Sequence, residues 1–278
     1  MKRILSGVVA VLVGSTSALA ADVYQPDVIQ APVVEQAAVS TGGWYLRGDL
    51  GYGYNKLRGA RFFQGSNGLV SDFNSAELKS GFSIGGGVGY KINNYLRTDV
   101  TLDYMFKSKF EGSTTGGCGV ATACTSRDYA SLSALSLLAN AYVDIGTYGI
   151  VTPYVGAGIG GTYVNCKDLN NTSCETGDPS NCDPTVTHKG KGSWRFTYAL
   201  MAGASVDVTC DVKADLGYRF KHVTKGDMFG YKLNGGPGWD KGYYSHEGRV
   251  GMRYMLNGCE QATYMPPAEI PMQQPVYK

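Results

Sequence analysis

The chain has 278 residues, of which 17% are charged, and its formal net charge is only +2. No global field of one sign points to nucleic acid as a partner. Glycine accounts for 39 residues, about twice its usual ~7% share, and tyrosine for 20. Because helical periodicity is hard to find beyond the first twenty positions, this composition favours an all-β protein.

The N-terminus has the pattern of a secretory signal peptide. Lys2 and Arg3 precede an apolar run, and small residues at Ala18 and Ala20 stand at the positions that a signal peptidase reads. We therefore expect residues 1–20 to be a signal peptide, cleaved after Ala20. The apolar run is shorter than the ~20 residues of a spanning helix, so any membrane residence must come from strands.

Eight stretches alternate apolar and polar residues with the period of two that indicates a β-strand. They are 44–54, 82–92, 96–106, 129–144, 152–165, 194–208, 211–222 and 243–256. In 211–222, for example, Leu216 and Phe220 lie on the face opposite Asp215 and Arg219. The alternation in 129–144 and 152–165 is blurred, so their register stays open.

The connections between these strands alternate between long and short. Long polar segments occupy 55–79, 107–128, 166–192 and 223–242, whereas the remaining connections, such as Asn93-Asn94, are tight. Long loops at one end and tight turns at the other are typical of an outer-membrane barrel. We predict an all-β fold over residues 43–258: an eight-stranded antiparallel up-and-down transmembrane β-barrel with four long extracellular loops. Residues 21–42 are expected to be a flexible periplasmic linker and 259–278 a proline-rich tail.

The polar face of the strands carries a balanced set of charges, which would form a network inside the barrel. Its members are Arg47, Asp49, Arg97, Asp99, Asp103, Arg195, Asp207, Lys213, Asp215, Arg219, Lys221, Glu247, Arg249 and Arg253. An eight-stranded barrel is only wide enough to be filled by its own side chains, so we expect these groups to neutralise one another there. In a soluble sandwich or a lipocalin-like barrel they would be solvated instead.

Aromatic residues at the strand ends favour the membrane barrel, because they would form its two girdles. One girdle comprises Trp44, Tyr90 and Tyr254, and the other Tyr104, Phe106, Trp194, Phe196, Tyr218 and Phe220.

Basic residues recur where the strands meet the long loops. This basic ring comprises Lys56, Arg58, Lys79, Lys107, Lys109, Arg127, Lys167, Lys189, Lys191, Lys225 and Lys241. If the loops face outward, the ring lies near the phosphates of lipopolysaccharide, which it can bind through charge-assisted contacts. The alternative is that these residues are simply solvated loop ends, among which acidic residues such as Glu111 also occur.

Seven cysteines in an exported chain predict disulfides. Cys118 and Cys124 are one candidate pair, and Cys210, in a tight turn, forms another with Cys259 after the last strand. Cys166, Cys174 and Cys182 share one polar segment, and the odd count leaves one thiol free or pairing between chains. No spacing matches a zinc site.

Two motifs superficially suggest catalysis or nucleotide binding. The glycine-rich run 156–161 lacks a following helix, so we interpret it as a set of barrel glycines that suit a crowded backbone. Ser245, His246 and Glu247 suggest a hydrolase, but alternation sends His246 to the opposite face from the other two. We expect no enzymatic activity and no cofactor.

The order of several short motifs resembles the small outer-membrane proteins of alphaproteobacteria, the 25/31 kDa major surface protein family. The motifs are GWYLRGDLGY at 43–52, GVGY at 87–90, RTDV at 97–100 and NAY at 140–142, after an Ala-Asp-Val mature start at 21–23. The resemblance covers about residues 21–256. It departs at the end, because such barrels usually stop at a terminal aromatic residue, whereas here a proline-containing tail follows Leu256.

Because a filled eight-stranded barrel leaves no room for a wide channel, the first hypothesis is a structural role that stabilises the bacterial outer membrane, and the resemblance adds a mechanism. Related barrels carry a mature Ala-Asp start that can be joined to peptidoglycan, which makes Ala21 the candidate attachment residue. A second hypothesis is a surface receptor or adhesin for haemin or a host ligand, with His188, His222, Tyr231 and Tyr243 as candidate haem-iron ligands. A third is a narrow, low-conductance pore.

Overall fold

The computed structural model describes residues 42–65, 68–233, 235–256 and 258. All of them belong to one compact unit, 38–264, whereas the other unit, 1–37 and 265–278, lies outside the described residues. The predicted signal peptide, nearly all of the linker and the predicted tail also fall outside them. No helix among the described residues is long and apolar enough to cross a membrane.

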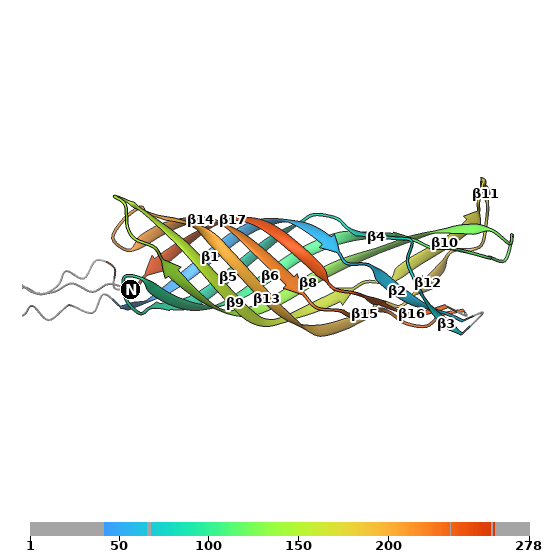
Figure 1. Ribbon diagram of the computed structural model, residues 1–278, viewed down its shortest axis with the longest axis horizontal. Coiled ribbons are helices and arrows are strands. Elements are labelled where there is room, and N and C mark those ends of the chain that lie inside the picture. Colours follow the sequence, from blue (N-terminus) through green and yellow to red (C-terminus); the bar gives the residue numbers. More distant parts are fainter. Residues whose placement is uncertain (1–41, 66–67, 234, 257, 259–278) are drawn as a thin grey trace, which may run out of the picture. The chain divides into compact units, whose positions relative to one another are not determined.

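Eight long strands pair side by side and close into an antiparallel barrel (Figure 1). They are β1 (Gly43–Leu57), β5 (Gly81–Lys91), β6 (Leu96–Ser113), β8 (Cys124–Asp144), β9 (Val151–Cys166), β13 (Gly192–Asp207), β14 (Val212–Val223) and β17 (Tyr243–Met255). The order around the barrel is β1-β5-β6-β8-β9-β13-β14-β17, and β17 pairs back with β1. The predicted eight-stranded barrel is therefore confirmed.

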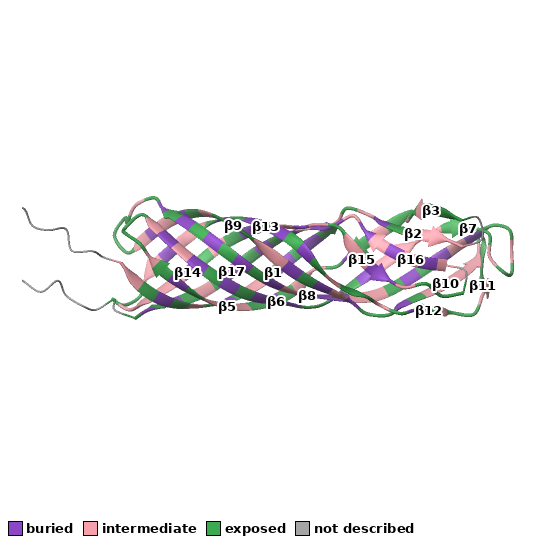
Figure 2. Ribbon diagram, turned by 90° about the horizontal axis from the view of Figure 1, so that it is seen from below, coloured by how far each residue is buried: buried purple, intermediate pink, exposed green. Residues whose placement is uncertain are grey.

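The faces of these strands are those of a membrane barrel. Trp44, Leu50 and Tyr54 on β1 are exposed, whereas Tyr45 and Asp49 on the same strand are buried inside. Figure 2 shows the same alternation of buried and exposed residues along the barrel strands. A soluble sandwich would bury the apolar face, so the exposed apolar surface belongs in lipid.

The exposed apolar surface has the height of a bilayer. On β1 it runs from Trp44 to Tyr54, and ten residue steps of ~3.3 Å, tilted by ~40°, span roughly 25 Å. Predicted girdle residues lie at its ends, where Trp44 packs edge-on against Tyr90 with ring centroids 5.2 Å apart and Trp194 packs on Tyr163 at 5.6 Å.

The four segments predicted as long loops contain further strands, so their description as polar loops needs correction (Figure 1). These strands are β2 (Ala60–Gln64), β3 (Leu69–Asp72), β4 (Ser75–Leu78), β7 (Thr115–Gly116), β10 (Leu169–Glu175), β11 (Asp178–Cys182), β12 (Val186–His188), β15 (Gly226–Phe229) and β16 (Gly235–Asp240). β4 extends the sheet beside β6 and β10 beside β8, while β15, β16, β2 and β3 form a separate four-stranded sheet. The prediction missed them because their outer faces are polar, like those of a soluble protein.

A β-bulge marks the level at which β6 leaves the lipid. The register with β8 shifts between Met105 and Ser108, both of which are buried. The extra residue places Phe106 and Lys107 together on the exposed face. The outer surface of the strand thus changes from aromatic to basic at this level. On both sides of the bulge, every second residue still points into the barrel.

The tight connections at the other end use local turn chemistry. Asn93 Oδ1 accepts hydrogen bonds from the backbone N–H groups of Tyr95 and Leu96, each at 2.8 Å. Gly149 adopts a φ of 65° between β8 and β9, a conformation that favours glycine. These turns match the short periplasmic connections of outer-membrane barrels, so the opposite end faces the cell exterior.

Candidate functional site

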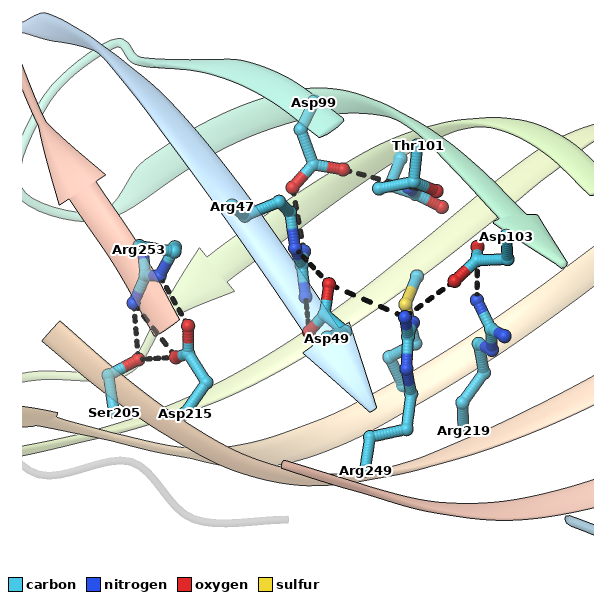
Figure 3. A network of polar contacts seen from close by, with 12 residues as sticks. Arg47, Asp49, Asp99, Thr101, Asp103, Ser205, Asp215, Arg219, Arg249 and Arg253 are labelled. Carbon is cyan, nitrogen blue, oxygen red and sulfur yellow. Dashed lines mark hydrogen bonds and ion pairs between the residues drawn. The ribbon is translucent and has the colours of Figure 1, made fainter. Parts of the chain in front are cut away.

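A continuous chain of ion pairs crosses the lumen (Figure 3). The Arg47 guanidinium donates to Asp49 and to Asp99, with N–O distances of 2.8 Å in both cases. Arg249 Nη2 lies 3.4 Å from Asp49 Oδ2 and 2.6 Å from Asp103 Oδ1. The chain therefore joins β1 and β17 to β6.

The chain continues to the opposite wall of the barrel. Arg219 Nη1 donates to Asp103 Oδ2 at 2.8 Å, its Nη2 to Glu247 at 2.5 Å, and Lys221 Nζ lies 3.1 Å from the same carboxylate. Asp103 on β6 and Arg219 on β14 are four strands apart in a closed ring of eight, which makes them diametrically opposed. Their contact closes the lumen at this level, and the void lined by Arg47, Arg219 and their neighbours measures only about 10 Å³, room for no more than about one water molecule.

The other predicted lumen charges form separate pairs. Arg253 donates to Asp215 at 2.6 Å (Figure 3), and Lys213 pairs with Asp207. Arg97 and Arg195 each find an acidic partner that the sequence prediction omitted: Asp144 at 3.0 Å and Asp240 at 2.6 Å.

Three of the omitted polar partners lie on β8. Asn140 donates to Asp99 at 2.8 Å, Tyr142 accepts a hydrogen bond from Arg47 at 2.8 Å, and Asp144 holds Arg97. They occupy every second position, so the signal was present in the sequence, but the blurred register of 129–144 hid it. Asp240 was missed because it lies in a segment predicted as a loop.

On the extracellular side of the ion pairs, apolar side chains fill the lumen. This apolar plug follows directly along the strands, since Met105 lies two residues beyond Asp103 and Val223 two beyond Lys221. Its buried members are Ala60, Leu78, Met105, Phe110, Leu132, Ala134, Val164, Cys166, Leu169, Val223, Met228, Phe229 and Tyr243. The prediction of a purely charged lumen was therefore incomplete. Several plug residues come from the segments predicted as loops.

The residues of the basic ring lie on the outer face. Ten of them are exposed, and Lys241 is half-buried beside Asp72, at 2.9 Å. Lys79 pairs with Glu77 and Glu111 at 3.0 and 3.1 Å. The lipopolysaccharide contact of this ring stays a prediction.

Disulfides brace the extracellular strands. Cys118 is bonded to Cys124 and Cys174 to Cys182, with Cα–Cα distances of 5.9 and 3.9 Å. Cys210 is also disulfide-bonded, and Cys259, its predicted partner, lies outside the described residues. Among the described cysteines, Cys166 is the free one, and it is buried.

A cavity of about 220 Å³ lies among the extracellular strands. Its lining includes Phe62 of β2, Asp128 of β8, Asn171 of β10, His188 of β12 and Phe229 of β15. The four segments that connect the barrel strands at this end therefore all contribute to one site. Sequence reasoning missed this site because its residues are far apart in the chain.

The candidate haem ligands do not gather in one place. His188 lines the cavity, whereas the His222 ring packs on Tyr244, with centroids 4.9 Å apart, on the outer side of the barrel. Tyr231 is exposed, and Tyr243 is buried in the apolar plug. Within the described ranges, no group of three or more His, Cys, Asp or Glu residues could hold a metal ion.

The hydrolase-like triplet is divided between two faces of β17. Ser245 and Glu247 are buried inside, where Ser245 Oγ donates to Glu247 at 3.1 Å. His246 is exposed and hydrogen-bonds to Tyr218 at 2.6 Å on the outer face. These three side chains therefore do not face one reaction site.

Comparison with known proteins agrees with the barrel geometry. Residues 7–255 match the model of the outer membrane protein beta-barrel domain. The chain belongs to this family. An uncharacterized protein of Brucella abortus strain 2308 is 37% identical over 263 residues, which cover 82% of this chain and 90% of that protein. A Rickettsia bellii protein named "Putative adhesin" is 30% identical over 223 residues, with coverages of 76% and 87%.

These relatives place the chain among the small outer-membrane barrel proteins of alphaproteobacteria, as the sequence motifs implied, and in the outer membrane. Among solved structures, neisserial surface protein A aligns with a TM-score of 0.43 and 20% identity, over 77% of this chain and 97% of that one.

Proposed function

We propose that this protein is a sealed, non-enzymatic barrel that acts at the cell surface as a receptor or adhesin. The observation that carries the proposal is a group of exposed apolar side chains beyond the basic ring. Leu69 and Val70 on β3 are 60% and 56% exposed, and Tyr231 and Leu233 in the β15–β16 turn are 60% and 71% exposed. We call these four residues the apolar tip.

The apolar tip is gathered in one place by the sheet register. Gly235, at the end of the β15–β16 turn, pairs with Gln64, which in turn pairs with Leu69. Lipid accounts for the exposed apolar residues of the barrel wall, but not for residues beyond the basic ring. Clustered exposed apolar side chains on a water-facing surface mark an interaction site.

The strands beneath the tip support a binding role. The tip stands on a four-stranded sheet whose strand β15 bridges to Gly190, next to β12, through Phe229. A surface held by sheet ladders loses little conformational entropy on binding, which favours affinity. The name of the Rickettsia bellii relative points in the same direction.

The other hypotheses have less support. A narrow pore conflicts with the ion pairs and the apolar plug that fill the lumen. Envelope stabilisation through peptidoglycan depends on Ala21, which lies outside the described residues, so that tether stays a prediction.

We expect the variant Tyr231→Ser/Leu233→Ser to reduce adhesion about tenfold, since two apolar anchors together contribute a little over 1.4 kcal/mol. The protein is displayed on a non-adherent Gram-negative strain, and bacteria bound to cultured mammalian cells are counted. Tyr148→Ser is the matched control, because Tyr148 is equally exposed but lies in the β8–β9 turn at the opposite end. Unchanged adhesion of the double variant, or wild-type adhesion no greater than that of the empty strain, would refute the proposal.

A further inference from the structure

The extracellular cavity has an aromatic floor. Phe73 packs edge-on against Phe62, with ring centroids 5.3 Å apart, and against Phe229 at 6.4 Å. The His188 ring packs on Phe229 at 5.3 Å. Phe229 also belongs to the apolar plug, so the floor rests on the packed interior of the barrel. The floor is therefore fixed in place before any ligand arrives.

One wall of the cavity carries a buried carboxylate. Asp128 is only 2% exposed and accepts hydrogen bonds from Ser126 Oγ to Oδ2 and from Asn171 Nδ2 to Oδ1, both at 2.6 Å. Each carboxylate oxygen has a second lone pair that these two donors leave unused. Asp128 is thus oriented by its neighbours and still able to accept a hydrogen bond from a ligand.

The cavity has no compensating cation in its described lining. The lining contains no lysine or arginine, and burial lowers the pKa of its one histidine, His188, which favours the neutral imidazole. Burial also raises the pKa of Asp128, against the opposing effects of the hydrogen bonds from Ser126 and Asn171 and of His188. The fixed chemistry of the site therefore consists of one carboxyl group and several aromatic side chains.

We propose that this cavity binds a small organic ammonium ion, with the ammonium group on Asp128 and the apolar part on the phenylalanine rings. The ammonium group gains a charge-assisted hydrogen bond to the carboxylate, and the apolar part gains packing on the aromatic side chains. An anion of the same size would meet Asp128 with no basic residue to offset the repulsion. This inference goes beyond surface adhesion and does not depend on it.

The dimensions of the cavity set the size of the ligand. A cavity of about 220 Å³ has room for several water molecules, which suits an aromatic amine with a short side chain. The lining residues Thr115 and Leu233 are exposed, so the cavity reaches the solvent at the extracellular end. A ligand from outside the cell can enter without crossing the barrel.

The test is a calorimetric titration of the purified protein in detergent micelles with 2-phenylethylammonium chloride. Saturable binding is expected, whereas 3-phenylpropionate, an anion of similar size, should not bind. No saturable binding of the ammonium ion, or equal binding of the anion, would overturn the proposal. These two titrations use the wild-type protein and therefore do not depend on the folding of any variant.

A pair of variants locates the site. Asp128→Asn keeps groups that can bond to Ser126 and Asn171 but removes the charge, and we expect affinity for 2-phenylethylammonium to fall at least about tenfold. Asp178→Asn is the control, since Asp178 is exposed on β11 and does not line the cavity. Equal affinities for wild type and Asp128→Asn would place binding elsewhere and refute the assignment. Circular dichroism verifies the strand content of both variants.

Discussion

Glu247→Gln is expected to lower the free energy of unfolding by about 3–5 kcal/mol. Lys221 is 1% exposed, and among the described residues Glu247 is the one acid that forms an ion pair with it. The substitution would therefore leave a buried ammonium group without its counter-charge. Arg219 would keep Asp103 as a partner. Reversible guanidinium unfolding in detergent micelles measures the effect.

A second variant separates charge from packing. In Lys221→Met/Glu247→Gln the stranded cation is removed together with its partner, so more than half of the lost stability should return. Glu77→Gln is the surface control: its carboxylate, which pairs with Lys79, is 68% exposed, and the change should stay below about 1 kcal/mol. If the double variant is as unstable as Glu247→Gln alone, unpaired charge is not the cause.

Gly160→Ala is expected to destabilise the barrel by about 3 kcal/mol, at the upper end of the effects of overpacking. A Cβ atom at this position would lie 2.0 Å from the carbonyl oxygen of Leu137. Because that oxygen belongs to the backbone of the paired strand β8, it cannot move aside as a flexible side chain could. β8 and β9 would have to separate locally, at the cost of ladder hydrogen bonds. The measurement is the same guanidinium titration.

Gly248→Ala provides the matched comparison for this effect. Gly248 lies on the barrel strand β17 and is exposed, and a Cβ there would meet no atom within 4 Å. The free energy of unfolding should change by no more than about 0.5 kcal/mol. Equal losses in the two variants would show that strand propensity, rather than the close approach of β8 and β9, determines the cost.

The transmembrane part of the fold could be predicted because most of its strands show a clear alternation of apolar and polar residues. In lipid, the outer face must be apolar along its whole length, so Leu216 and Phe220 opposite Asp215 and Arg219 indicate both the strand and its orientation. The same alternation assigned the inward charges, and the structure brings Arg219, Asp103 and Glu247 into contact. It failed on β8, where the apolar residues Leu132, Ala134 and Leu138 face inward and interrupt the pattern.

The extracellular half could not be read in the same way. Beyond the bulge at Phe106 and Lys107 the outer surface meets water, so polar residues no longer distinguish a strand from a loop. The cavity depends on contacts between residues as distant in sequence as Phe73 and Phe229. Such contacts follow from closure of the barrel, which no local pattern in the chain encodes.

Single-channel conductance of the purified protein in a planar bilayer tests the sealed lumen most directly. The contact of Arg219 with Asp103 across the barrel, together with the apolar plug, predicts an inserted protein that produces no reproducible conductance steps. Insertion is verified separately by protease protection of the barrel in vesicles. Large, reproducible steps from the inserted protein would contradict the filled interior and would make transport, rather than surface binding, its function.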